Sequence, residues 1–160
     1  MLTLEISIED INDNTPQIIG DYNTQVSEGS PVQTVVFQMS YNDGDSGENK
    51  RPYYSIVSGN YDSSFKIEPF SGYVQVSAAL DRETRSVYYL VIKVSDLGSP
   101  QLYSTATATI TISDVNDNPP TFIQGEREFF VDENVPFYTK VGRLDAVDKD
   151  EGVNAQLFYK

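Results

Sequence analysis

Acidic and amide side chains crowd the stretch DVNDN, which runs from Asp114 to Asn118. A near copy, DINDN, occupies residues 10–14, so the pentapeptide occurs twice, 104 residues apart. Other acids also fall between strand-like runs, namely Glu28, Asp43, Asp45, Asp81, Glu83, Asp96, Asp148 and Asp150. All of these side chains offer oxygen, and the chain has no cysteine and no histidine. An all-oxygen ligand set is the one that a hard cation such as calcium prefers.

The composition of the chain fits cation binding better than other kinds of partner. It has 24 acidic and 11 basic residues, a formal charge of −13. Nucleic acid and anionic membrane surfaces would both repel such a chain, so we expect no nucleic-acid partner and no direct membrane contact. Without histidine, the commonest general base and the commonest zinc ligand are missing.

Several motifs recur along the chain at nearly the same spacing. Glu28 and Glu133, Asp43 and Asp148, and Asn49 and Asn154 each lie 105 residues apart. A unit of this length matches one immunoglobulin-sized sandwich. We therefore predict three parts: 1–14 as the last strand and linker of a preceding repeat, 15–118 as one complete repeat with its linker, and 119–160 as the amino-terminal part of a following repeat.

The elements that must position these acids read as short strands. Apolar and β-branched runs between turn residues predict about seven strands, near 17–26, 32–39, 52–57, 64–67, 73–76, 87–94 and 105–112. The run at 87–94 is almost wholly apolar, which is expected of a central strand buried on both sides. Residues 2–8 alternate like 105–112 and read as a last strand without its sheet. No stretch carries a helical period, so the sequence predicts an all-β sandwich.

Strand order groups the acids at the two ends of such a sandwich, because successive strands turn at alternating ends. Glu28, the loop LDRET (residues 80–84) and the DVNDN exit fall at one end, and the Asp43 loop and Asp96 at the other. Six carboxylates would then meet at the second pentapeptide: Glu28, Asp81, Glu83, Asp117, Asp148 and Asp150. Unpaired, they would repel strongly, and three divalent cations would cancel their charge. Linker carbonyls could complete the 6–8 oxygens that each calcium takes.

The motifs DxNDNPPxF, LDRE, xEN-P and DxDxGxN, in this order and spacing, resemble the extracellular repeats of the cadherin superfamily. The resemblance implies a seven-stranded Greek-key β-sandwich, with calcium ions, usually three, that stiffen each junction between repeats. The chain has no tryptophan, so it fits non-classical members of the protocadherin or giant cadherin kind. TPQI after the first pentapeptide departs from the usual PPxF, without touching a ligand.

The family pattern assigns ligands residue by residue. At the second junction it implies side chains of Glu28, Asp81, Glu83, Asn116, Asp117, Asp148 and Asp150, and backbone carbonyls of Val115, Asn118 and Asn154. At the first junction the matching residues are Ile11, Asn12, Asp13, Asn14, Asp43, Asp45, Asn49 and Asp96. Glu133 would serve a third junction.

The same residues admit alternative interpretations. An EF-hand loop at Asp148 would need Glu at its twelfth position, where Tyr159 stands. Asp81 and Glu83 could form a glycosidase-type pair, which would make the chain a carbohydrate-active β domain. A secreted bacterial-type cadherin-like adhesin is a further alternative.

The favoured interpretation is a calcium-dependent cell–cell adhesion module, not an enzyme, in which calcium at the junctions rigidifies a rod-like ectodomain. It would lie in the extracellular part of a plasma-membrane protein whose anchor is outside this stretch. Its partners would be other cadherin ectodomains, whether homophilic or heterophilic.

Overall fold

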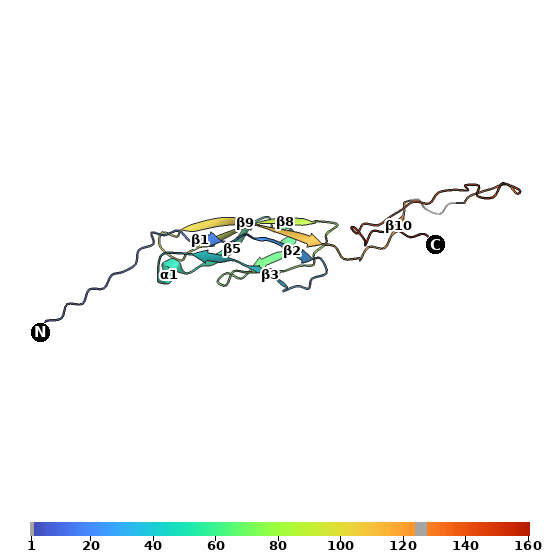
Figure 1. Ribbon diagram of the computed structural model, residues 1–160. Helices are drawn as coiled ribbons and strands as arrows, with labels where there is room; N and C mark the ends of the chain where they lie inside the picture. Colours follow the sequence, from blue (N-terminus) through green and yellow to red (C-terminus); the bar gives the residue numbers. More distant parts are fainter. Residues whose placement is uncertain (1, 124–127) are drawn as a thin grey trace. The chain divides into compact units, whose positions relative to one another are not determined.

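The computed structural model describes residues 2–123 and 128–160. The chain divides into two compact units, Met1–Ser113 and Asp114–Lys160, and most of the regular structure lies in the first (Figure 1). None of the helices in the described ranges is long and apolar enough to cross a membrane.

Two antiparallel-rich sheets form the body of the first unit. One sheet has the strand order β2-β9-β8-β5 and the other β3-β7-β6, with a further pair β1-β4. The bounds are β1 Gln17–Ile19, β2 Asn23–Ser27, β3 Val35–Gln38, β4 Ser40–Asn42, β5 Tyr53–Ser58, β6 Phe65–Ile67, β7 Tyr73–Val76, β8 Val87–Ser95 and β9 Tyr103–Ser113. Strand β2 runs parallel to β9, whereas β8 is antiparallel to both β9 and β5. The prediction of an all-β sandwich is confirmed.

The core lies between the two sheets. Leu90, Ile92 and Ile110 from the larger sheet are fully buried against Val74 and Val76 from the smaller one. Burying one such side chain contributes about 1.5–3 kcal/mol, so the alternating apolar positions are what hold the layers together. The alternation over 105–112 predicts one shared face for Ala106, Ala108, Ile110 and Ile112. The last three are buried in the core, and Ala106 is partly buried against it.

Three details of the strand prediction are wrong. The opening strand is split at Gly20, which has a φ of +109°, and the Tyr22 hydroxyl fills the corner and accepts a bond from the Ser40 amide at 2.8 Å. The strand expected at 32–39 begins only at Val35, after a turn closed by Thr34 N–H on the Pro31 carbonyl at 3.1 Å. Strand β8 is not buried on both sides, because a sandwich covers one face of each sheet; Tyr89 is 61% exposed.

The loop expected after 39 also contains more structure than the sequence predicts. Residues Ser40–Asn42 form β4, and Gly47–Lys50 form the single turn α1, which Gly47 opens with a φ of +58°. A second single turn, η1, spans Tyr61–Ser63.

Residues 2–8 form no strand, and their apolar side chains are exposed, as expected of a strand without its sheet: Leu2, Leu4, Ile6 and Ile8. In the second unit, β10 (Thr121–Phe122) pairs with β11 (Ala146–Val147).

Candidate metal centre

Three carboxylates are buried together with their loops in the first unit. Asp43 and Asp45 follow β4 and are 3% and 4% exposed, and Asp96 follows β8 and is 0% exposed. Burying ionised carboxylates is costly unless hydrogen bonds or cations compensate them. The surroundings of these three residues therefore decide what the loops can bind.

Backbone amides satisfy much of Asp96. Its Oδ1 accepts bonds from the Gly98 and Leu102 amides at 3.0 and 3.1 Å. The Asp96 amide in turn donates to the Leu102 carbonyl at 3.1 Å, which closes the loop and brings the chain back to β9. The loop is therefore built around the carboxylate.

The Asp43 loop is closed in a similar way. The Asp45 amide donates to Asp43 Oδ1 at 3.0 Å, a local turn typical of aspartate. Lys50 Nζ, at the end of α1, donates to the Asp43 carbonyl at 2.6 Å. The lysine thus bonds the backbone of Asp43, and within the described residues no ion pair neutralises the Asp43 carboxylate.

The first pentapeptide docks on these loops through its amides. Asn12 Nδ2 donates to Asp96 Oδ2 at 3.1 Å and to the Pro100 carbonyl at 2.6 Å. The backbone amide of Asn14 donates to Asp45 Oδ2 at 3.1 Å, and its side-chain amide bonds Asp45 Oδ1. The linker prediction for Asn12, Asn14, Asp43, Asp45 and Asp96 therefore describes residues that the fold does bring together.

Two buried oxygen atoms in this group have no hydrogen-bond partner among the described residues: Asn12 Oδ1 and Asp43 Oδ2. An unpaired buried oxygen costs about 1–3 kcal/mol, more when it is charged. Buried oxygen atoms of this kind, next to buried carboxylates, fit a hard metal ion. The donor set is wholly oxygen, which suits calcium better than zinc.

Asp10, the first residue of the same pentapeptide, fixes the linker to residues at and before α1. Its Oδ2 accepts bonds from Asn49 Nδ2 at 3.0 Å and from the Ser46 amide at 3.1 Å. The Asn49 bond, followed by the Ser46 bond, holds the pKa of Asp10 below its ordinary value. Asp10 is not among the predicted ligands, although an aspartate opens both pentapeptides.

The second unit repeats this arrangement. Asn118 bonds Asp150 through its backbone amide at 3.2 Å and through its side chain at 3.0 Å. The Asp150 amide donates to Asp148 Oδ1 at 3.0 Å. Asp114, the counterpart of Asp10, accepts bonds from the Glu151 amide and from Asn154 Nδ2, both at 2.9 Å. Asp114 and Asp150 have carboxylate oxygens within 4.8 Å of each other.

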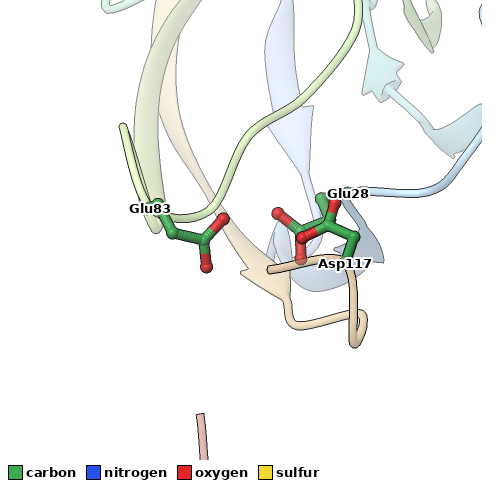
Figure 2. A group of neighbouring side chains, drawn as sticks. All are labelled: Glu28, Glu83 and Asp117. Carbon is green, nitrogen blue, oxygen red and sulfur yellow. The ribbon is translucent and has the colours of Figure 1, made fainter. Parts of the chain in front are cut away.

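The opposite end of the sandwich gathers Glu28 and Glu83. Glu28 follows β2, is 6% exposed, and accepts a bond from the Arg82 amide at 2.7 Å. Carboxylate oxygens of Glu28 and Glu83 lie within 4.8 Å of each other, and both side chains are drawn in Figure 2. Arg82 forms an ion pair with Glu83, so part of the charge there is already balanced.

Asp81 lies in the same loop, and its carboxylate bonds to a residue of that loop. Its two oxygens accept bonds from the Thr84 amide and hydroxyl, each at 2.9 Å. With Asp81 held by Thr84 and Glu83 paired with Arg82, the geometry gives no support to a glycosidase-type carboxylate pair. The remaining predicted ligands lie at exposed positions, namely Ile11, Asp13, Val115, Asn116 and Asp117, as does Glu133.

A family model for the cadherin domain matches residues 22–113, more than half of the chain. The chain belongs to the cadherin superfamily. Its cadherin domain coincides with the sandwich whose loops carry the buried carboxylates, and it is a module of the adhesion type.

Known cadherins resemble the chain over almost all of its length. Rat cadherin EGF LAG seven-pass G-type receptor 2 is 43% identical over 159 residues, which is 98% of this chain and 7% of that protein. Human protocadherin Fat 1 is 40% identical over 158 residues, again 98% of this chain but 3% of that protein. The chain thus spans a small fraction of the curated relatives it matches.

Among solved structures, mouse cadherin-23 EC22-24 superposes with a TM-score of 0.86 at 35% identity. The match covers 92% of this chain and 48% of that one. The resemblance to the cadherin family drawn from the sequence motifs is confirmed.

Proposed function

We propose that this cadherin chain is a calcium-dependent adhesion module in which calcium at the linkers stiffens a rod of repeats. The observation that carries the proposal is the buried group Asp43, Asp45 and Asp96. Within the described residues, Asp43 Oδ2 of this group and the neighbouring Asn12 Oδ1 have no hydrogen-bond partner. Burying several ionised carboxylates together lowers the stability of a fold unless a bound cation compensates their charge.

The distribution of charge supports cation binding over a merely solvated acidic surface. None of the strands in the described ranges contains aspartate or glutamate, although the whole chain has 24 acids. Acids that served only solubility would also occupy the outward positions of strands. In the described ranges, the acids of this chain lie in loops and linkers, apart from Glu48 in α1 and Asp62 in η1.

The proposed ligands are those that the family pattern assigns. For the first linker they are the side chains of Asn12, Asp43, Asp45 and Asp96, with the other residues of 11–14 and Asn49. For the second they are Glu28, Asp81, Glu83, Asp148, Asp150, Asn154 and residues 115–118, among which Asp117 is the third residue labelled in Figure 2. Bound calcium would supply positive charge that cancels the repulsion between carboxylates of neighbouring segments.

The chain's own residues prepare the linkers for that role. Asn12 and Asn14 hold the first linker on buried carboxylates, and Asn118 holds the second linker on Asp150. A linker fixed in this way loses less conformational freedom on binding, which favours affinity. We place the module in the extracellular part of a plasma-membrane receptor, with other cadherin ectodomains as partners; the animal receptors among its relatives favour this over a bacterial adhesin.

The test is calorimetric titration of the 160-residue chain with calcium, comparing the wild type with Asp117→Asn. This substitution keeps the size of the side chain and removes one charge from the proposed second linker site. We expect affinity to fall by about 10–100-fold, at least as much as loss of an outer-sphere partner costs a metal site. Asp62→Asn, at an exposed position in η1, is the matched control. Equal affinities for the three proteins would refute the assignment.

A further inference from the structure

Gly98 packs against the side-chain amides of Asn12 and Asn49, which a side chain at residue 98 would have to displace. A Cβ atom added to it would lie 2.4 Å from Asn12 Nδ2 and 2.7 Å from Asn49 Oδ1, closer than the 3.0 Å below which real Cβ contacts essentially never fall. Its φ is outside the left-handed region that favours glycine. The need for glycine at this position therefore comes from the linker that packs on it.

The contact matters because Gly98 and Asn12 converge on one carboxylate. The Gly98 amide donates to Asp96 Oδ1 at 3.0 Å, and Asn12 Nδ2 donates to Asp96 Oδ2 at 3.1 Å. A second bond, from Asn12 Nδ2 to the Pro100 carbonyl, fixes which way the amide is turned. Asn12 Oδ1 is then the buried atom left without a partner among the described residues.

Gly44 provides an internal comparison. A Cβ on Gly44 would lie 3.0 Å from Asn14 Cγ and Oδ1, a tight but less severe approach, and its φ is also outside the left-handed region. The repeat places Lys149 at the matching position, and there the Asn118–Asp150 bonds form at 3.2 and 3.0 Å. A side chain at the Gly44 position is therefore compatible with linker docking.

We propose that Gly98 is a positioning residue: because it has no side chain, Asn12 can pack against Asp96 and hold the first linker on its loop before any cation binds. We call the contact of Asn12 with Gly98 and Asp96 the seat of the linker, and all three residues lie in the first unit. What this seat does for calcium binding rests on the proposed function.

The seat can be tested on the full chain in EDTA by amide hydrogen exchange at Asp13 and Asn14, whose N–H groups bond the Ile11 carbonyl and Asp45 Oδ2. We expect Gly98→Ala to speed exchange at these two amides at least about tenfold, whereas Gly44→Ala stays within about threefold of wild type. Exchange in β8 and β9 reports separately whether the sandwich remains folded.

Asn12→Ala keeps the test decisive if Gly98→Ala disturbs the fold. It removes the amide and leaves the glycine, so it should free the linker to the same extent. Because the two residues act through one contact, the double variant should be no worse than Asn12→Ala alone. Unchanged exchange in Gly98→Ala and Asn12→Ala, or equal effects of Gly98→Ala and Gly44→Ala, would overturn the proposal.

A calcium titration of the same variants separates the two proposals. If the wild type binds calcium and Gly98→Ala binds about tenfold more weakly while Gly44→Ala does not, the seat serves the metal centre. If no protein binds calcium, the proposed function fails, and the exchange measured in EDTA still decides whether Gly98 seats the linker.

Discussion

Asp96, a candidate calcium ligand, also organises the loop that follows β8. It lies at the end of β8, is fully buried, and accepts bonds from Gly98, Leu102 and Asn12. Its position after a long apolar strand was enough to predict that it shares an end with the Asp43 loop. Its role as the centre of its own loop depends on backbone amides, which no residue pattern reveals.

Replacing Asp96 with asparagine tests that structural role. An amide nitrogen would then face N–H donors, so we expect Asp96→Asn to lower the free energy of unfolding in EDTA by about 1–3 kcal/mol. Urea denaturation of the full chain measures the loss, with Asp62→Asn as the control at an exposed site. Increased stability of Asp96→Asn would mean that repulsion from Asp43 and Asp45 outweighs these hydrogen bonds.

Tyr54 gives a residue-scale prediction away from the acids. Burial, then the nearby Tyr41 and Tyr22, raises its pKa from 10.0 to about 12. The unfolded chain therefore loses the Tyr54 proton first as the pH rises. The contribution of Tyr54 to the free energy of unfolding is fully present below pH 10 and is lost between pH 10 and 12.

Comparison with Tyr54→Phe isolates that contribution. Between pH 9 and 11, the free energy of unfolding should fall by roughly 1 kcal/mol more in the wild type than in Tyr54→Phe. Urea denaturation at the two pH values measures it, and Tyr89→Phe, at a 61% exposed site, should behave as wild type. Parallel pH profiles for wild type and Tyr54→Phe would contradict the assignment.

At the scale of elements, strand β8 shows where sequence patterns mislead. An almost continuous apolar run favours burial on both faces, but the four-stranded sheet has another layer on one side only. The alternation in burial along β8, with Leu90 and Ile92 inside and Tyr89 outside, comes from tertiary packing. The alternating pattern of β9 carried that information directly, so its faces were predicted correctly.

Replacing a side chain of β8 with alanine should lower the free energy of unfolding more on the inward face than on the outward face. Ile92→Ala removes a fully buried side chain from the core and should lower the free energy of unfolding by about 2–5 kcal/mol. Val91→Ala, next to it on the outward face, should cost less than about 1 kcal/mol. Chemical denaturation of both variants in the same buffer compares them, and equal losses would place the core elsewhere.

The split of the opening strand and the single turn α1 were beyond the sequence for a different reason. Both depend on one glycine in a left-handed conformation, Gly20 and Gly47 respectively. Glycine permits such a φ without requiring it, so its presence predicts a possible break and not its place. The acids of the Asp43 loop, which precede Gly47, could be assigned to an end of the sandwich, but their hydrogen-bond partners could not.

At the scale of the whole molecule, the repeat appears in the hydrogen bonds as well as in the sequence motifs. Asp10 with Asn49 and Asn14 with Asp45 in the first unit recur as Asp114 with Asn154 and Asn118 with Asp150 in the second. The repeated spacing predicted which residues would correspond. The bracing role of Asp10 and Asp114 was missed because both carboxylates were read only as part of an acidic cluster.

The central claim is that calcium, and not merely any divalent cation, couples linker to repeat. The most direct measurement is hydrogen exchange and limited proteolysis of residues 114–118 in the full chain, titrated with calcium and, in parallel, with magnesium. Calcium accepts the flexible, carboxylate-rich oxygen sets that magnesium, with its strict octahedral geometry, binds poorly.

We expect calcium to slow exchange and cleavage in this linker cooperatively, magnesium at the same concentration to have little effect, and Asp117→Asn to abolish most of the protection. Linker exchange that ignores calcium, or responds equally to both ions, would contradict the account and reduce these acids to a solvated surface.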